Sequence, residues 1–294
     1  MQKGPLSIVT RQQLACICLS ILFQSLQSAL AEEPSFDVPS QSLKLAAGLP
    51  GGLPIDLAGF HTGMTQQEAL AKLTELAGTH NAQVQRWTGR LPYAKQNFLA
   101  AARLGFDDDD GQTTVLLTLT SNASGNQVFS INRDIYYKAG AEPGTDAYVQ
   151  AIRDKYGEPS LIEQRNQELY LRYRFIDGRI APGQKDQSIC HPLQTAADGH
   201  ARYLDPNVIL ANAWHHVKQN DSSKERCSAY LFIQLRFVHS NNLTNPKAVA
   251  DASFGFADGE RMSFSVQRDS EITTLLNQKA KDAAVVQGTG TPKL

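Results

Sequence analysis

The stretch TTVLLTLTSNASGNQVFSINRDIYY, residues 113–137, decides the fold class because it holds two alternating segments around a short polar linker. In the first segment Val115, Leu117 and Leu119 fall on one side of an extended chain, and residues 122–126 supply asparagine, serine and glycine between the segments. Alternation with a period of two indicates a β-strand, and a short glycine-containing linker suits a hairpin loop. The stretch therefore predicts two adjacent antiparallel strands.

Two helices are predicted from capping residues and apolar spacing, one before and one after this hairpin. In the first, Thr65 and Glu68 form a capping box ahead of an apolar stripe that ends at Gly78. In the second, Thr145 is the expected cap and Gly157 the terminator. Apolar residues at helical spacing pack one side of a helix against another element. Both helices are therefore expected to lie on a sheet.

Further strands are predicted after the second helix. The segments LYLRYRF at 169–175 and AYLFIQLRFV at 229–238 alternate apolar residues with polar or charged ones. Near the C-terminus, ASFGF and MSFSV flank Asp258-Gly259, a dipeptide that suits a two-residue hairpin turn. We therefore predict a last hairpin centred on this dipeptide, followed by a short helix from Glu271 to Ala280.

The order helix, strands, helix, strands predicts an α+β fold with antiparallel sheet and the two main helices on one face. A parallel, doubly wound fold would need strands that alternate regularly with crossover helices. The pattern fits either a single sheet or two similar lobes. The expected parts are a signal peptide over residues 1–31, a flexible tether over 32–56, an N-terminal α+β lobe over 57–180, a C-terminal mainly-β lobe over 181–283 and a disordered tail over 284–294.

The N-terminal segment matches a secretory signal peptide. Lys3 and Arg11 precede the apolar run LACICLSILF at 14–23, and the small residues Ala29 and Ala31 supply a cleavage site. The run is well short of the roughly 20 apolar residues that a membrane-spanning helix needs. We therefore expect export, cleavage after Ala31, a periplasmic or secreted location and no membrane span in the mature chain.

The charge balance argues against a nucleic-acid partner. The chain has 28 basic and 29 acidic side chains, which gives a formal net charge of −1. Loss of the signal peptide would leave it nearly neutral. A nucleic-acid-binding protein is expected to show a basic excess or a clustered basic face. The length is enough for one large domain or two small ones to bury a core.

The cysteines predict one disulfide bond. Two of the four cysteines lie in the signal segment, which leaves Cys190 and Cys227 in the mature chain. In an oxidising compartment such a pair is expected to be bonded, and the bond would stabilise the fold by about 3 to 4 kcal/mol in the chain-entropy model. It would also brace the long loop over 176–227. A nucleophilic Cys190 beside His191 is disfavoured, because side chains adjacent in sequence point apart.

The segments GMTQQEALAKL at 63–73 and DKYGEPS at 154–160 together resemble small exported α+β modules. These modules are of the SmpA/OmlA outer-membrane assembly lipoprotein type and the beta-lactamase-inhibitor-protein type. The resemblance implies a sheet with helices on one face. It also implies proteins that act by contacting other proteins rather than by catalysis, which is an expectation from analogy.

Histidine spacing gives little support for a metal site. The chain has seven histidines but no HExxH or Cys-x-x-Cys ligand set. His215 and His216 are sequential, and on a strand their rings would point to opposite faces. A loop-borne site from His191, His200 and His215 remains an alternative to surface histidines. We therefore expect no metal and no cofactor.

The acidic run FDDDDGQ is expected to be a solvated turn between strands. With Gly111 at the sixth position of a calcium loop, Phe106 would stand first and Leu117 twelfth, where that loop needs an aspartate and a glutamate. No Gly-x-Ser-x-Gly, Gly-x-x-x-x-Gly-Lys or Gly-x-Gly-x-x-Gly motif occurs. The sequence therefore predicts no catalytic residues, although active sites can also assemble from distant residues.

The segment RWTGRLPYAK offers candidate interface residues. Trp87, Arg90 and Tyr93 could contact a partner, because aromatic residues and arginine are the usual interface anchors. The alternative is that Trp87 fills the edge of the core.

Two functions remain from the sequence. The first is a non-catalytic binding protein of a Gram-negative-type periplasm, whose partner is a protein or another cell-envelope component. The second is a hydrolase or metal-dependent enzyme with a site on the 176–227 loop. The enzyme would need several of His191, His200, His215 and Asp205 to converge in a deep pocket.

Overall fold

The computed structural model describes residues 34–43, 55–176, 178–183, 190–198, 200–201, 205, 227–238 and 248–288. The chain divides into two units, Met1–Ser35 and Phe36–Leu294, and the helices and strands of the described residues belong to the second. The predicted signal peptide, with Ala29 and Ala31, lies outside the described residues. So do most of the predicted tether, most of the 176–227 loop and the end of the predicted tail.

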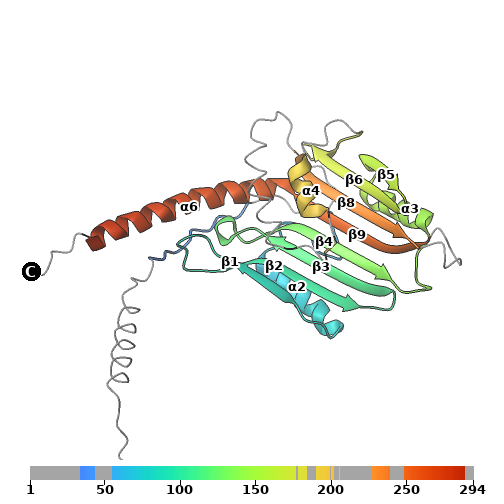
Figure 1. Cartoon of the computed structure of the whole chain (residues 1–294), viewed down its shortest axis with the longest axis horizontal. Coiled ribbons are helices and arrows are strands. Elements are labelled where there is room, and N and C mark those ends of the chain that lie inside the picture. The colour runs from blue at the N-terminus through green and yellow to red at the C-terminus, as the bar shows by residue number, and fades with distance from the viewer. Residues whose placement is uncertain are drawn as a thin grey trace, which may run out of the picture. The chain divides into compact units, whose positions relative to one another are not determined.

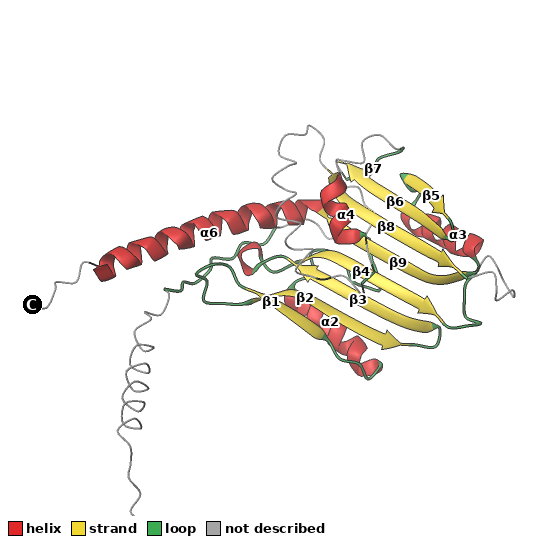
Figure 2. Cartoon of the chain, viewed as in Figure 1, coloured by secondary structure: helices red, strands yellow, loops and turns green. Residues whose placement is uncertain are grey.

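One antiparallel sheet of nine strands forms the centre of the described part of the chain (Figures 1 and 2). Its order is β1-β2-β3-β4-β9-β8-β6-β5, with β7 paired to β6. The predicted α+β class is confirmed. The strands are β1 (Gln85–Gly89), β2 (Phe98–Asp107), β3 (Gly111–Leu119), β4 (Val128–Tyr137), β5 (Leu161–Arg165), β6 (Glu168–Ile176), β7 (Arg179–Ile180), β8 (Cys227–Phe237) and β9 (Val249–Asp258).

The two predicted helices are present as α2 (Gln66–Thr79) and α3 (Thr145–Tyr156). The predicted cap of α3 is wrong, because Gly144 is the N-cap and Thr145 is the first residue of the helix. The capping box of α2 is complete, because Thr65 Oγ1 accepts from the Glu68 backbone at 3.3 Å and the Glu68 carboxylate accepts from the Thr65 backbone at 2.7 Å. Such a cap stabilises a helix by about 1 kcal/mol. Gly157 ends α3 with φ of 83°, a backbone conformation that favours glycine.

Both helices pack on the same face of the sheet, which we call the first face. Leu73 of α2 and Ile152 of α3 are buried in one apolar cluster with the sheet. Full burial stabilises each aliphatic side chain by about 1.5 to 3 kcal/mol. The prediction of two main helices on one face is therefore confirmed. The strands contribute Leu104, Val115, Leu117, Ile131, Leu171, Leu231, Ile233, Leu235 and Phe256 to this cluster.

The sheet consists of two similarly built halves. In each half a helix is followed by an antiparallel run of strands, and the last strands of the two halves, β4 and β9, pair at the centre. The resemblance extends to detail. Thr65, which caps α2, bridges Gln127 just before β4, and Gly144, which caps α3, bridges Ala248 just before β9. The predicted boundary between the two lobes, after residue 180, does not interrupt the sheet, because β6 before it pairs with β8 after it.

The prediction of a hairpin at Asp258-Gly259 is wrong, because a 30-residue helix, α6 (Gly259–Gly288), begins there. Asp258 acts as a helix cap. Its Oδ1 accepts from the Arg261 backbone at 3.0 Å, and its Oδ2 lies 3.0 Å from the Arg261 guanidinium. The alternation in MSFSV covers only five residues, which is too short to distinguish a strand from a helix. The longer spacing decides for a helix, and its buried apolar residues are Met262, Val266, Ile272, Leu276 and Ala280.

The middle of α6 packs on the first half of the sheet. Ile272 and Leu276 contact Leu91 and Ala94 in the β1–β2 connection. Next to them, Asp269 accepts hydrogen bonds from Ser121 and Ser124 at the β3–β4 turn, and burial raises the pKa of Asp269 to about 6. The predicted helix Glu271–Ala280 is therefore part of a longer helix that joins the two halves.

Candidate functional site

The second face of the sheet carries ordered rows of polar side chains. Residues that pair across strands stand side by side, and a step of two residues along a strand keeps the same face. The central polar row is Gly105, Thr114, Asp134, Ser253, Gln234, Tyr170 and Glu163. The outer row is Asp107, Gln112, Tyr136, Asp251, Arg236, Glu168 and Arg165. Thr114, Asp134 and Ser253, in the middle of the central row, are buried, so the accessible candidate surfaces lie toward the two ends of the sheet.

One part of the second face is covered by α4 (His191–Ala197). The end of this helix is held on the sheet, because Ser130 Oγ donates to the Ala196 carbonyl at 2.9 Å and Asn132 Nδ2 donates to the Ala197 carbonyl at 3.0 Å. Gly255 makes this contact possible, since a Cβ there would stand 1.9 Å from the Ala197 oxygen. In Figure 1, α4 lies in front of the sheet and α2 and α3 lie behind it.

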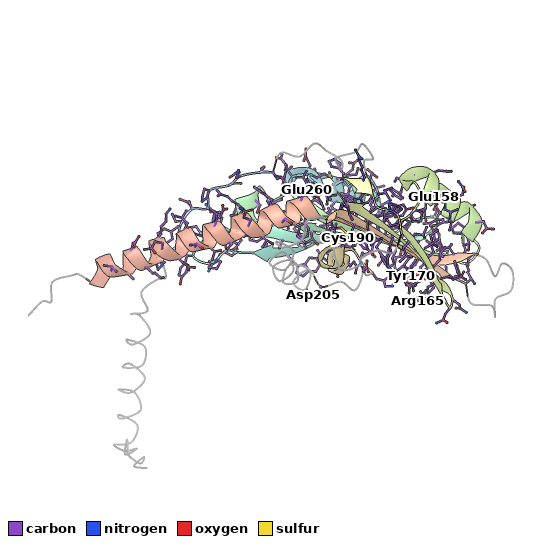
Figure 3. All side chains as sticks on the ribbon, turned by 90° about the horizontal axis from the view of Figure 1, so that it is seen from above. Glu158, Arg165, Tyr170, Cys190, Asp205 and Glu260 are labelled. Atoms are coloured by element: carbon purple, nitrogen blue, oxygen red, sulfur yellow. A yellow bond between two sulfur atoms is a disulfide. The ribbon has the colours of Figure 1, made fainter. Side chains whose placement is uncertain are left out.

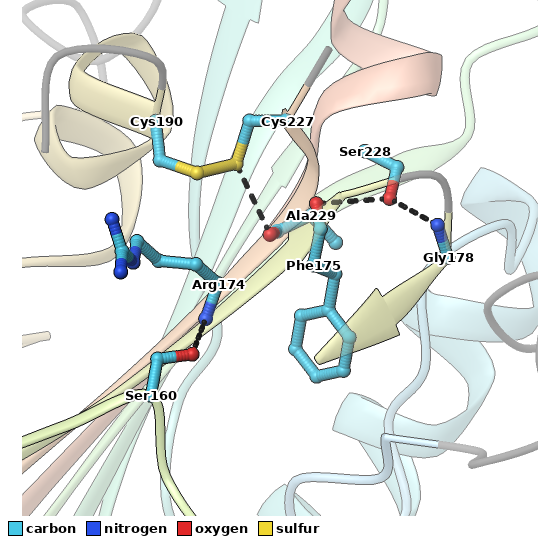
Figure 4. Close-up of a disulfide and its surroundings, with 8 residues drawn as sticks. All are labelled: Ser160, Arg174, Phe175, Gly178, Cys190, Cys227, Ser228 and Ala229. Carbon is cyan, nitrogen blue, oxygen red and sulfur yellow. Dashed lines mark hydrogen bonds between the residues drawn. A yellow bond between two sulfur atoms is a disulfide. The ribbon is translucent and has the colours of Figure 1, made fainter. Parts of the chain in front are cut away.

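The start of α4 is joined to β8 by the Cys190–Cys227 disulfide, with a Cα–Cα distance of 5.2 Å (Figure 4). The predicted disulfide is therefore confirmed. Beside it, Ser228 Oγ donates to the Phe175 carbonyl at 3.1 Å and accepts from the Gly178 backbone at 3.0 Å. These bonds tie the beginning of β8 to the end of β6.

The His200 cluster follows α4 and lies on the central row. Ser253 Oγ donates to Asp134 at 2.8 Å, and His200 Nδ1 lies 2.7 Å from Ser253 Oγ and 3.5 Å from Asp134. Hydrogen bonding to Asp134 raises the pKa of His200. Next in the outer row, Arg236 Nε donates to Asp251 at 2.5 Å. The cluster therefore joins the segment after α4 to β4 and β9.

The His200 cluster has the residue types of a catalytic triad but the wrong polarity of hydrogen bonds. A general base must accept the serine proton. Here that proton goes to Asp134, so His200 Nδ1 donates to Ser253 rather than accepting from it. The Ser253 side chain is also buried, with 1% of its surface exposed. These atoms form a structural bond network, and Ser253 is not poised as a nucleophile.

The Tyr170 cluster lies at the β5–β6 end of the second face. The Tyr170 ring stands between two arginines, with the guanidinium carbons of Arg165 and Arg172 at 5.9 and 5.4 Å from its centre. Glu163 binds both arginines, through Arg165 at 2.6 Å and Arg172 at 2.8 Å. The Tyr170 hydroxyl donates to Glu168, which raises the pKa of Tyr170. These contacts link all five side chains to one another.

The Tyr170 cluster remains accessible. The Arg165 side chain is 63% exposed and that of Arg172 is 19% exposed. Figure 3 shows Arg165 and Tyr170 on the same side of the sheet as Asp205, whereas Glu158, beyond the end of α3, lies on the other side. The cluster therefore belongs to the face that α2 and α3 leave uncovered.

The structure does not bring the three predicted interface residues together. Trp87 packs on the second face, with the Arg103 guanidinium 5.1 Å from its ring, while Arg90 is exposed. Tyr93 packs instead beside Ile272 on α6. An interface role for these residues stays a prediction.

The residues of the enzyme alternative fall only partly within the described chain. His200 joins the cluster above and Asp205 is exposed, whereas the His191 side chain and His215 lie outside the described residues. Among the residues that the structure describes, no group of three His, Cys, Asp or Glu could hold a metal ion. The acidic run forms the predicted turn, since Asp108 Oδ1 accepts from the Gly111 backbone at 2.9 Å.

His200 was a predicted candidate of the metal and enzyme alternatives, whereas its partners Asp134 and Ser253 and the Tyr170 cluster were not predicted. One available signal was the outer side of the strand LYLRYRF, where Tyr170 alternates with Arg172 and Arg174. Tyrosine and arginine on the polar side of a strand are the residue types of an interface. The His200 cluster had no such signal, because Asp134 and Ser253 are far apart in sequence.

Comparisons with protein-family models, curated proteins and solved structures find no match to this chain. Among the helices that the structure describes, none is both long enough and apolar enough to cross a membrane.

Proposed function

We propose that this chain is an exported, non-catalytic binding protein that contacts a protein or another cell-envelope component through the Tyr170 cluster. The observation that carries the proposal is the Tyr170 ring between Arg165 and Arg172, with Glu163 bound to both arginines. Tyrosine and arginine are enriched among the residues that dominate binding energy at interfaces.

Preorganisation supports this assignment. Long side chains lose conformational freedom when they bind, at about 0.5 to 1.5 kcal/mol for each side chain that becomes fixed. Here Glu163 and Glu168 already hold the arginines and the tyrosine in place. The residues lie on regular strands of a wide sheet, and a partner would meet a surface whose shape is set before binding.

The His200 cluster favours binding over catalysis for the same face. Its serine proton is bonded to Asp134, and Arg236 is paired with Asp251. The second candidate function is a hydrolase that uses His200, and the observation in its favour is the raised pKa of His200 beside Asp134. Any such enzyme would have to rearrange the Ser253 bonds first.

Export is supported by the basic and apolar N-terminal pattern and by the Cys190–Cys227 bond. Disulfides persist in oxidising compartments and are rare in the cytosol. This part of the proposal concerns location only and does not depend on the partner.

The proposal is tested by retention of envelope components on immobilised protein. The test variant is Tyr170→Ala with Arg172→Ala. The matched control is Gln150→Ala with Asp154→Ala, a hydrogen-bonded exposed pair on α3. We expect the wild type and the control to retain the same component, identified by mass spectrometry. The test variant should bind it at least tenfold more weakly, since a central interface residue contributes about 2 kcal/mol or more.

Two results would contradict the proposal. One is equal retention by the test variant, after circular dichroism has shown that it is folded. The other is a hydrolytic activity of the wild type that His200→Ala abolishes, which would favour the enzyme.

A further inference from the structure

A pocket of about 430 Å³ opens on the second face at the β1–β2–β3 end of the sheet. Its volume lies within the range of small-molecule sites. The lining comes from three neighbouring strands and from Gln83, two residues before β1, so that a ligand would lie across the strands. The lining residues are Gln83, Gln85, Arg103, Gly105, Gln112 and Thr114. We call this depression the Gly105 pocket.

Gly105 is one of the residues that line the pocket, and the fold itself does not require a glycine there. Its φ is outside the left-handed region, and a Cβ at this position would meet only Thr114 Oγ1, at an ordinary distance of 3.6 Å. A glycine inside a strand destabilises it by roughly 0.5 to 1 kcal/mol relative to alanine. Glycine in a strand often marks the close approach of a ligand. The missing side chain therefore creates the space of the pocket.

The chemistry of the lining indicates a neutral ligand rich in hydroxyl groups. Gln83, Gln85 and Gln112 present carboxamides, each of which can both donate and accept hydrogen bonds. The Thr114 hydroxyl has the same dual character. Neighbouring hydroxyls of a sugar ring also donate and accept, and carboxamides can pair with them two bonds at a time.

Arg103 does not make the pocket an anion site. Its guanidinium lies over the Trp87 ring, and the charges of Asp134 and Asp205 oppose the lowering of its pKa by burial. The negative charges of these two carboxylates act on Arg103, and they would also repel an anionic ligand at this site. Arg103 remains able to donate to a neutral oxygen.

We propose that the Gly105 pocket binds a neutral saccharide, whose hydroxyls pair with the carboxamides of Gln83, Gln85 and Gln112. A peptide added to the edge of the sheet would pair with β1 alone, whereas the pocket reaches across β1, β2 and β3. The site stands at the opposite end of the second face from the Tyr170 cluster, and its ligand does not depend on the proposed protein contact.

The proposal is tested by titration calorimetry of the full-length exported protein. The neutral probes are chitotriose, cellotriose and maltotriose, and the anionic probes are trigalacturonate and inorganic phosphate. We expect saturable binding of at least one neutral probe. Gly105→Val should fill the pocket and weaken this binding at least tenfold, and Gln112→Ala should weaken it at least threefold.

The matched control is Gly78→Ala, because a Cβ at Gly78 meets nothing within 4 Å. This variant should bind the neutral probe like the wild type. Thermal unfolding separates the two roles of the glycine, since Gly105→Val should be at least as stable as the wild type while it loses binding. The proposal is overturned if no neutral probe binds, if only an anionic probe binds, or if folded Gly105→Val binds as the wild type does.

Discussion

The two faces of the sheet differ in what their side chains contact. On the first face Leu117, Leu235 and Phe256 are buried under α2 and α3 in one apolar cluster. On the second face polar rows lie beside α4, and their side chains bond to one another through Asp134, Ser253 and the Tyr170 cluster. The first face therefore stabilises the fold by apolar packing, whereas the second face has less apolar packing and presents ordered polar groups. Substitutions on the two faces should therefore have separable effects.

The largest effect is expected from the first face. Leu117 and Leu235 are fully buried and occupy corresponding places on β3 and β8 in the two halves. Leu117→Ala and Leu235→Ala should each lower the free energy of unfolding by about 3 to 5 kcal/mol. The exposed Leu275→Ala serves as control, with a change under about 0.5 kcal/mol.

Denaturant unfolding should also show one transition for each of these leucine variants, because β4 and β9 make the halves a single sheet. Two separate transitions, with each variant shifting only one of them, would mean that the halves unfold independently.

The next effect concerns the second face and its disulfide. Cys190→Ser with Cys227→Ser should lower the free energy of unfolding by about 2 to 4 kcal/mol, since the bond joins residues 37 apart in the sequence. Reduced wild type should unfold at the same denaturant concentration as this variant. An unchanged midpoint in both would show that α4 is held on the sheet by its other contacts.

The third effect is a pH dependence of the free energy of unfolding, which arises from Asp198 on the second face. Burial raises the pKa of Asp198, at the end of α4, to about 7 from 3.8. The folded protein therefore holds this proton more tightly than the unfolded chain, and stability falls as the pH rises from about 4 to about 7. Asp198→Asn should match the wild type at pH 4 and exceed its stability by about 2 kcal/mol at pH 8.

Asp154→Asn, at an exposed position of α3, is the control for this titration and should show the wild-type pH dependence. If Asp198→Asn is less stable than the wild type at pH 8, then attraction between the Asp198 carboxylate and Arg172 outweighs the burial of the charge.

The smallest effect on stability is expected at the Tyr170 cluster. Arg165 is 63% exposed and its bond to Glu163 is a surface ion pair. Arg165→Ala should change the free energy of unfolding by less than about 0.5 kcal/mol, while retention of the partner decreases. A large loss of stability with unchanged retention would assign Arg165 to the fold instead of the interface.

Much of the first face could be predicted from sequence, because its signals are local. The capping box at Thr65 and Glu68 and the alternation in β3 each lie within a few residues.

Strands β1 and β2 were not predicted, for physical reasons. An irregular register between Trp87 and Thr88 interrupts β1. In β2 the run Ala100–Ala102 is buried on both sides and shows no alternation.

The second face could not be predicted in the same way. Asp134 and Ser253 become neighbours only through the pairing of β4 with β9. No local pattern specifies such long-range pairing. The prediction of a hairpin at Asp258 was wrong for a related reason, because long-range contacts of α6 with the first half of the sheet stabilise the helix. The bonds of Asp258 to Arg261 also cap its first turn.

The most direct test of the account places a photo-crosslinking amino acid, p-benzoylphenylalanine, at Tyr170 in one protein and at Gln150 on α3 in another. Each protein is irradiated with cell-envelope extract, and covalent adducts are separated on denaturing gels and identified by mass spectrometry. The account predicts a discrete adduct from position 170 and none of the same species from position 150. An adduct of equal yield from both positions, or from position 150 alone, would contradict binding through the second face.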